Sequence, residues 1–201
     1  MLKFYTNPQS RGQIAHWMLE EVGQPYDTVV VRFGGEKPAD FLAANPMGKV
    51  PALAVEGDSV TEAAAIIAYL AARFPEANLG PRPDELAPYY RWMFFAAGPV
   101  EQAVVGKSMG WEVPEGREGM VGFGTFDRTI KALDDWLGSH HYVCGDRFTA
   151  ADVYVGSQVD WGLQFGSIPA SPALTAYAER LRARDAYKRT KAINAKLIEG
   201  S

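Results

Sequence analysis

Short apolar runs alternate with a helix-like apolar spacing at the start of the chain. The segments LKFYT (residues 2–6) and TVVVR (residues 28–32) are rich in β-branched and aromatic side chains and predict two strands. The apolar residues between them follow the spacing of one helix face: Ile14, Trp17, Met18 and Val22. A helix that joins two strands indicates a parallel pair with a right-handed crossover.

The pattern changes after Pro38. A short helical or irregular piece is followed by PALAV (residues 51–55) and SV (residues 59–60), and the residues EGD between them predict a tight hairpin. The next apolar residues mark one face of a helix that ends before Pro75: Ile66, Ile67, Leu70 and Phe74. The predicted order of the first domain is therefore β-α-β-α-β-β-α.

The segment PEANLGPRPDE (residues 75–85) carries three prolines and a glycine, which makes it the best linker candidate. Apolar residues beyond it follow helical spacing: Leu86, Tyr90, Met93 and Ala97. Gly98 and Pro99 are expected to kink this helix because proline removes a backbone hydrogen bond. We expect a first domain over residues 1–78, a linker over residues 79–86 and an all-helical domain over residues 87–201.

Three further helix signals support the all-helical second part. Apolar residues at helical spacing outline one helix: Phe126, Ile130, Leu133 and Leu137. Thr149 and Asp152 stand at the offset of a capping box and predict a buried central helix. Ser171 before Pro172 is typical of a cap followed by proline in the first turn. The fold class is predicted as α/β plus all-α.

Composition narrows the range of functions. The chain has 201 residues, of which 47% are hydrophobic, and a formal net charge of −4, so its overall field does not favour nucleic acid. No segment approaches the roughly 18 consecutive apolar residues that a membrane helix needs, so we expect a cytoplasmic protein without a membrane partner. Cys144 is the only cysteine, and the three histidines lack companions at metal-ligand spacing, so we expect no metal.

The stretch NPMGKVPAL places Pro51 at the entry to an apolar strand, where it removes an N–H from the ladder. If the Val50–Pro51 bond is cis, the backbone of Val50 faces outward and can pair with a peptide-like ligand. The alternative is an edge strand that begins with an ordinary trans proline. Pro51 alone does not decide between the two.

The order and spacing of four motifs resemble a cytosolic glutathione transferase over essentially the whole chain. They are FYTNPQSRGQIAHWMLEEVGQPYD, NPMGKVPAL, SVTEAAAIIAYLAARFP and GDRFTAADV. The chain is most similar to bacterial members with a serine at the start of the first helix. The resemblance implies a thioredoxin-like domain that binds glutathione, a helical domain that forms most of the electrophile pocket, and a homodimer.

The chemistry of such a site needs a group that stabilises the thiolate, because free glutathione is largely a thiol at neutral pH. Ser10 stands at the predicted helix start, where a hydroxyl and the positive end of the dipole act together. Ser10 and Gln13 also form an S-x-x-Q pattern, so Ser10 can instead serve only as a cap. By resemblance to the serine type, Ser10 ranks first as the catalytic residue. Tyr5 ranks second, at the position of the thiolate donor in tyrosine-type members.

The resemblance carries over to the glutathione contacts unevenly. Lys49 matches a lysine that contacts the glycyl carboxylate, and Val50 is expected to pair with the cysteinyl backbone. Glu62 matches the acidic half of a Glu-Ser pair that holds the γ-glutamyl end, but this chain has Ala63 in place of the serine. The implied glutathione-binding residues are Arg11, Lys49, Val50, Pro51, Glu62 and Ala63.

Aromatic and methionine side chains are the candidates for the electrophile pocket because such residues commonly line concave sites. The candidates are Tyr89, Trp92, Met93 and Trp111. The expected function is conjugation of the glutathione thiolate to hydrophobic electrophiles. The alternatives are a non-catalytic binding protein with this fold, which Ala63 favours, and glutathione-dependent reduction of peroxides or disulfides.

Overall fold

The computed structural model describes residues 1–199, which form two compact units. One unit comprises residues 1–80 together with the residues from Ala183 onward, and the other comprises residues 81–182. Among residues 1–199, no helix combines the length and the apolar character needed to cross a bilayer.

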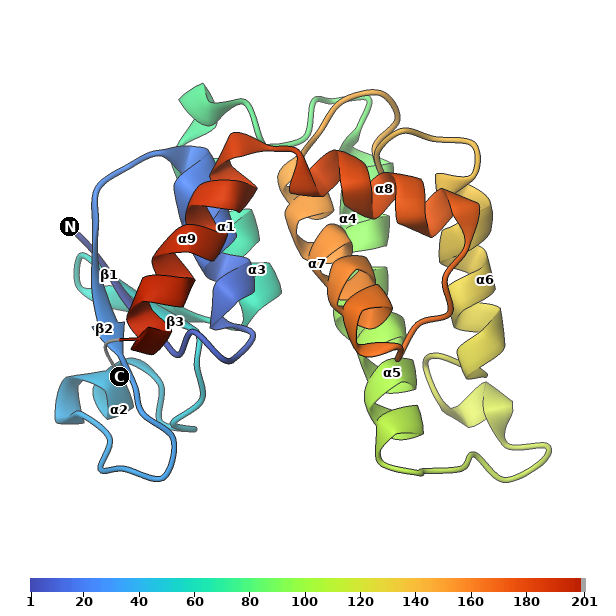
Figure 1. Cartoon of the computed structure of the whole chain (residues 1–201), viewed down its shortest axis with the longest axis horizontal. Helices are drawn as coiled ribbons and strands as arrows, with labels where there is room; N and C mark the ends of the chain where they lie inside the picture. The colour runs from blue at the N-terminus through green and yellow to red at the C-terminus, as the bar shows by residue number, and fades with distance from the viewer. Residues whose placement is uncertain (200–201) are drawn as a thin grey trace. The chain divides into compact units, whose positions relative to one another are not determined.

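The first unit contains the predicted β-α-β-α-β-β-α order (Figure 1). Its elements are β1 (Leu2–Thr6), α1 (Gly12–Val22), β2 (Tyr26–Val30), α2 (Ala39–Ala44), β3 (Ala52–Val55), β4 (Asp58–Thr61) and α3 (Ala63–Arg73). A single turn of 3₁₀ helix, η1 (Pro75–Ala77), follows α3. The thioredoxin-like fold class is confirmed.

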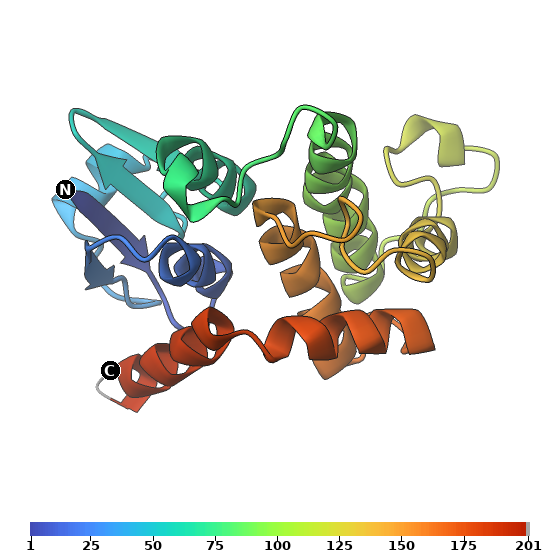
Figure 2. The ribbon, with the colours of Figure 1, turned by 90° about the horizontal axis from the view of Figure 1, so that it is seen from above.

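The sheet has the strand order β2-β1-β3-β4. β1 pairs in parallel with β2, β3 is antiparallel to β1, and β4 is antiparallel to β3, as the crossover and hairpin signals predict. Helices α1 and α3 lie on one side of this sheet and α2 on the other (Figure 2). Because side chains alternate along a strand, Phe4 and Tyr5 face opposite layers, and Tyr5 packs on the α2 side with Val31, Phe41 and Ala52.

The second unit is helical, as predicted. It contains α4 (Leu86–Phe95), the π-helical turn η2 (Ala96–Val100), α5 (Glu101–Ser108), the 3₁₀ turn η3 (Glu118–Met120), α6 (Phe126–Leu137), α7 (Ala150–Phe165) and α8 (Pro172–Arg182). Pro99 lies inside η2, so the expected kink takes the form of a π turn between two α-helices.

The residues of α4 that show helical spacing in the sequence do not all lie on its buried face. Met93 is buried, whereas Leu86 and Tyr90 are 45% and 48% exposed. The buried residues are Tyr89, Trp92 and Met93, and Trp92 packs against the ring of Trp136 in α6 with centroids 5.3 Å apart. The helix carries two apolar stripes, and packing against the neighbouring helices selects the one with the larger rings.

The predicted caps are confirmed. Thr149 and Asp152 form a reciprocal capping box at the start of α7, and the N–H of Leu174 donates to Ser171 Oγ at 3.1 Å. The Asp152 carboxylate is completely buried and accepts hydrogen bonds from Val143 N (2.9 Å), Thr149 N (2.8 Å) and the Tyr177 hydroxyl (2.9 Å). This side chain therefore connects three segments of the helical unit.

The last helix, α9 (Asp185–Glu199), packs against α1 in the first unit (Figure 1). His16 Nδ1 and Asn194 Oδ1 are 2.9 Å apart, and the Arg184 guanidinium donates to both carboxylate oxygens of Glu21 at 2.7 and 2.8 Å. From the sequence, this segment is predicted to belong to the helical domain, within residues 87–201. The exact limits of the domains and the linker stay a prediction.

Candidate active site

A cavity of about 400 Å³ opens in the first unit where three loops meet. These loops are the turn before α1, the connection between β2 and α2, and the residues before β3. The lining residues are Gln9, Ser10, Arg11, Val31, Arg32, Phe33, Gly34, Lys37, Gly48, Lys49 and Val50. The structure therefore brings together four of the residues that the sequence analysis selected: Ser10, Arg11, Lys49 and Val50.

The position of Ser10 is set by the turn between β1 and α1. Asn7 fixes this turn, because its Nδ2 donates to Val31 O at 2.9 Å and its Oδ1 accepts from Gln9 N at 2.8 Å. The Ser10 hydroxyl donates to Asn7 O at 2.7 Å and accepts from Gly12 N at 2.9 Å. It thus lies at the N-terminal end of α1, where the helix dipole is positive and favours an anion.

The capping-box alternative for Ser10 is wrong in its details. Gln13 N donates to the backbone oxygen of Ser10 at 3.1 Å, and Gln13 Nε2 donates to Pro8 O at 2.5 Å. Neither bond is one of the reciprocal pair that defines the box. Ser10 does satisfy one backbone donor of the first turn, Gly12 N, so it combines a structural bond with its place in the cavity.

Gly12 lets the first turn of α1 lie close to the end of β1. A Cβ at this position would lie 2.1 Å from Thr6 Oγ1 and 3.0 Å from Ser10 Oγ. Thr6 Oγ1 is buried and has no hydrogen-bond partner within residues 1–199. Since any larger residue at position 12 would displace Thr6 or Ser10, Gly12 helps to fix the position of the Ser10 hydroxyl.

The charged side chains that line the cavity within the described residues are all cationic: Arg11, Arg32, Lys37 and Lys49. The ammonium group of Lys37 passes over Gly48, where a Cβ would lie 2.7 Å from Nζ. Asn45 Nδ2 donates to Lys49 O at 2.7 Å and holds the loop before β3. This positive lining favours carboxylates and thiolates over their protonated forms.

Arg32 and Lys37 are not among the site residues predicted from the sequence. They belong to the connection RFGGEKP after β2, which contains two glycines and three charged residues. A cationic, glycine-containing loop at the carboxyl end of a strand was the available signal, since ligands often bind there in parallel α/β sheets.

Tyr5 is placed differently from Ser10. Its side chain is only 2% exposed, stacks at a tilt against Phe41 and is not among the lining residues of the cavity. Its hydroxyl donates to Asp40 Oδ2 at 3.0 Å, and Lys3 forms a salt bridge with the same carboxylate. Burial, followed by the hydrogen bond to Asp40, raises the pKa of the Tyr5 phenol, so this group stays protonated at neutral pH.

The remaining predicted glutathione contacts lie at the ends of two elements. The Val50–Pro51 peptide bond is cis, and Val50 precedes Ala52, the first paired residue of β3. Glu62 adopts a left-handed backbone conformation, with φ of 67°, just before Ala63 opens α3. Glu62 and Ala63 lie outside the lining of the 400 Å³ cavity.

The candidates for the electrophile pocket separate into two groups. Tyr89, Trp92 and Met93 are buried in the structure. Trp111 is 67% exposed and lines a second cavity, of about 520 Å³, within the helical unit. The assignment of all four to the electrophile pocket stays a prediction.

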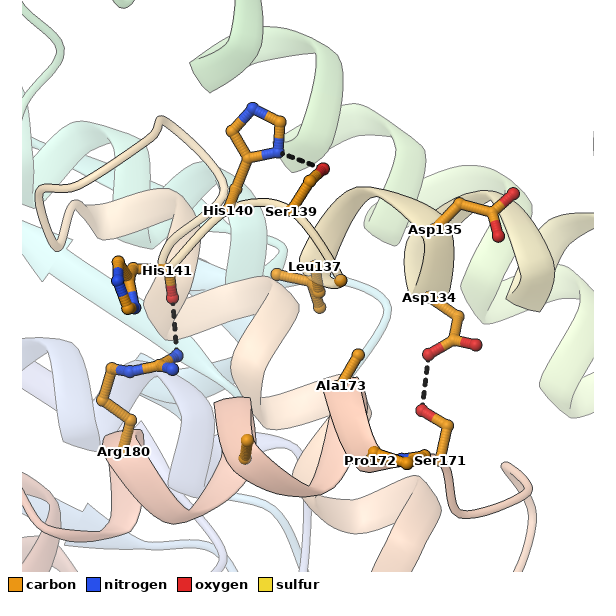
Figure 3. A pocket seen from close by; sticks show the side chains of 12 residues that line it. Asp134, Asp135, Leu137, Ser139, His140, His141, Ser171, Pro172, Ala173 and Arg180 are labelled. Carbon is orange, nitrogen blue, oxygen red and sulfur yellow. Dashed lines mark hydrogen bonds between the residues drawn. The ribbon is translucent and has the colours of Figure 1, made fainter.

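A larger depression, of about 870 Å³, lies between α6 and α8 but lacks a catalytic arrangement (Figure 3). The Ser171 hydroxyl donates to Asp134 Oδ1 at 2.5 Å and caps α8. His140 Nδ1 lies 2.9 Å from Trp136 O and 3.0 Å from Ser139 Oγ. The polar groups here therefore bind one another. In the part of the chain that the structure describes, no cluster of three histidine, cysteine or acidic side chains could hold a metal.

Two family models match this chain, and both describe glutathione S-transferases. Residues 10–73 match the model of the N-terminal domain of glutathione S-transferases, and residues 118–185 match the model of their C-terminal domain. The chain is 33% identical to glutathione S-transferase GstB of Escherichia coli K12 over 147 residues, which are 68% of this chain and 71% of that protein.

Two solved structures resemble the whole chain. A glutathione transferase from Methylococcus capsulatus is 29% identical with a TM-score of 0.80, over 97% of this chain and 99% of that one. A sphingomonad glutathione S-transferase in complex with glutathione is 26% identical with a TM-score of 0.76, over 96% and 98% of the two chains.

Proposed function

Because the chain belongs to the glutathione S-transferase family, we propose that it is a serine-type member that conjugates glutathione to hydrophobic electrophiles. The observation that carries this proposal is the position of the Ser10 hydroxyl, at the positive end of α1 and in a cavity lined by four cations. Tyr5, the rival residue, is buried and donates to Asp40.

In the proposed reaction, bound glutathione loses its thiol proton to solvent. The sulfur lone pair then attacks an electrophilic carbon, a C–S bond forms, and the leaving group departs with its bonding pair. For an epoxide the C–O bond opens instead, and the alkoxide takes a proton from water. The protein accelerates these steps by stabilising the thiolate, which is the reacting nucleophile.

Ser10 can supply that stabilisation by rotating its hydroxyl. In the structure its proton is donated to Asn7 O, a neutral acceptor. A hydrogen bond to an ionised acceptor is roughly twice as strong as one to a neutral acceptor. Donation from Ser10 to a thiolate is therefore more favourable than donation to Asn7 O. The Gly12 N–H holds the oxygen in place during the rotation.

The rest of glutathione finds partners of suitable charge in the same unit. We assign Lys49 to the glycyl carboxylate, the backbone of Val50 beside Pro51 to the cysteinyl residue, and Glu62 to the γ-glutamyl end. Arg11 adds positive potential next to Ser10. The missing hydroxyl at Ala63 removes a hydrogen bond to the γ-glutamyl carboxylate, which weakens binding by about 1.5–3 kcal/mol where nothing replaces it.

We also propose that the protein is a homodimer. α4 presents an exposed apolar stripe at i, i+4 and i+8, formed by Leu86, Tyr90 and Phe94, and Phe94 is 66% exposed. The rings of Tyr90 and Phe94 stack with centroids 6.3 Å apart. Such a stripe is typical of a protein interface. In sedimentation, Phe94→Glu should give a smaller species than the parent protein. An unchanged size would exclude this face of α4 as the dimer interface.

The cytoplasmic location and the absence of a metal stay predictions.

A second candidate function is that of a non-catalytic binding protein with this fold. Ala63 favours it because the missing hydroxyl weakens glutathione binding. The two candidate functions are distinguished by measuring conjugation with a panel of aryl halides and epoxides. We expect glutathione-dependent product formation that falls in Ser10→Ala. A folded protein that binds glutathione but converts none of the panel would contradict the enzymatic proposal.

A further inference from the structure

Helix α9 packs along one face of α1 (Figure 1). The residues of α1 on this face are spaced three or four positions apart, as neighbours on a helix surface are. They are Gln13, His16, Trp17 and Glu20, and their partners in α9 are, in the same order, Lys191, Asn194, Tyr187 and Arg189. The contact at Gln13 differs from the others because it lies in the first turn of α1, beside the turn that carries Ser10.

The Gln13 side chain also binds the turn before α1. Its Nε2 donates to Pro8 O at 2.5 Å. The N–H of the same peptide unit, Gln9 N, donates to Asn7 Oδ1 at 2.8 Å. Both polar groups of the planar Pro8–Gln9 peptide are therefore held. Since Ser10 follows this peptide directly, the hydrogen bond from Gln13 helps to set the direction in which the Ser10 side chain points.

Lys191 determines which end of the Gln13 amide faces the turn. Lys191 Nζ donates to Gln13 Oε1 at 3.2 Å and lies 5.3 Å from the centroid of the Tyr187 ring. An ammonium group has three donors and no acceptor. If the amide were turned by 180°, two donors would meet at Lys191 and two acceptors would meet at Pro8 O. The charge on Lys191 therefore selects the orientation in which Gln13 Nε2 faces Pro8 O.

The docking of α9 does not account for the bond between Gln13 and Pro8. Both partners of this bond belong to the segment around the start of α1, so the bond adds nothing to the attachment of α9. At the other end of α1, the Arg184 guanidinium holds α9 through both carboxylate oxygens of Glu21. The second bond of Gln13 instead ties the first turn of α1 to the loop that precedes Ser10.

We propose that Gln13 is a positioning residue for Ser10 and that Lys191 in α9 keeps Gln13 in the orientation this role requires. Neither side chain needs to touch the reacting atoms. The position of the Ser10 hydroxyl depends on these hydrogen bonds alone, whereas its effect on a thiolate rests on the function proposed above.

The first test measures the position of Ser10 without any reaction. Gln13→Met keeps the length and the helix preference of the side chain and removes both of its hydrogen bonds. Amide hydrogen exchange in the full-length protein is followed by NMR at Gln9 and at Gly12, whose N–H donates to Ser10 Oγ. Both amides should exchange about fivefold faster in Gln13→Met. Parent-like exchange at both amides would overturn the proposal.

The second test measures the pH dependence of conjugation. Gln13→Met should raise the pKa of the bound glutathione thiol by about half a unit, which lowers the rate below that pKa about threefold. In the Ser10→Ala background the same substitution should cause little further change, because it acts through Ser10. An equal shift in both backgrounds would show that Gln13 does not act through Ser10, and the positioning role would fail.

Lys191→Met and Arg189→Met form a matched pair in α9. Each removes one positive charge and one contact with α1, but Arg189 binds Glu20, about 10 Å further along α1 than Gln13. Lys191→Met should change amide exchange and the pH profile in the same direction as Gln13→Met, and Lys191→Arg should restore both to those of the parent protein. Arg189→Met should change neither. Equal changes in the two methionine variants would indicate a general effect of charge or docking and would overturn the role of Lys191.

The outcomes distinguish this inference from the proposed function. If amide exchange responds as expected but Ser10→Ala leaves the pH profile unchanged, the positioning of the Ser10 hydroxyl stands and the catalytic role of Ser10 fails. If Ser10→Ala shifts the profile and Gln13→Met changes neither exchange nor profile, the catalytic role stands and the positioning role of Gln13 fails.

Discussion

Replacing Ser10 by alanine should raise the pKa of the bound glutathione thiol and slow conjugation below that pKa. The hydroxyl gains a hydrogen bond to an ionised sulfur, worth about 1.5–3 kcal/mol, and gives up its bond to Asn7 O, worth about 1 kcal/mol. The net effect of about 0.5–2 kcal/mol corresponds to roughly 0.4–1.5 pKa units. The fraction of thiolate below the pKa, and the rate with it, should fall about 2- to 30-fold.

The same substitution has a structural effect that must be measured separately. Ser10→Ala removes the acceptor of Gly12 N at the start of α1, which should lower the free energy of unfolding by about 1 kcal/mol. The pH dependence of the conjugation rate gives the change in the thiol pKa, and thermal unfolding gives the change in stability.

Tyr5→Phe is the matched control for Ser10→Ala. It removes a hydroxyl that donates to Asp40, and Tyr5 is not one of the residues that line the cavity. We expect this variant to keep the pH–rate profile of the parent protein. A profile that shifts in Tyr5→Phe and not in Ser10→Ala would exclude Ser10 as the thiolate donor and transfer the catalytic role to Tyr5.

Three further changes test other parts of the structure. Ala63→Ser should tighten glutathione binding by about tenfold or more in calorimetry, because it restores a hydrogen bond to a carboxylate, and an unchanged affinity would mean that another group already holds it. Lys49→Met should weaken the binding of glutathione and make its affinity less dependent on salt concentration, because a cation in the cavity is removed. An equal salt dependence in both proteins would exclude an ion pair between Lys49 and the glycyl carboxylate. Burial raises the pKa of Asp152 to about 6, above the ordinary value of 3.8. Between these two pH values the folded protein binds a proton at Asp152 that the unfolded chain does not bind. The contribution of Asp152 to the free energy of unfolding therefore decreases as the pH rises from about 4 to about 6. In urea unfolding, the free energy of unfolding of Asp152→Asn should therefore lack this decrease between about pH 4 and pH 6. An equal change with pH in the variant and the parent protein would contradict this role of Asp152.

The sequence predicted the elements well where the chemistry is local. Strands β1 and β3, the capping box of Thr149 and Asp152, and the Ser171 cap all depend on residues within a few positions of one another. The buried face of α4 was less predictable because the helix offers two apolar stripes, and the partners that select between them, such as Trp136, are distant in the sequence.

The same distinction applies to the candidate site. Ser10, Lys49 and Val50 belong to motifs that are readable in sequence, and they lie together in the cavity. Arg32 and Lys37 complete the cationic lining from the loop after β2. The charges and glycines of this loop are a local signal, but which residues it faces depends on sheet pairing. The docking of α9 on α1 through Asn194 and Arg184 is equally a matter of tertiary contacts.

Ser10 and the cationic cavity lining should lower the pKa of the bound glutathione thiol. This prediction is tested most directly by following the ultraviolet absorbance of the thiolate against pH, with and without the parent protein at saturating concentration. The bound thiol should ionise at a pH at least about one unit below that of free glutathione. Binding with an unchanged thiol pKa would contradict it.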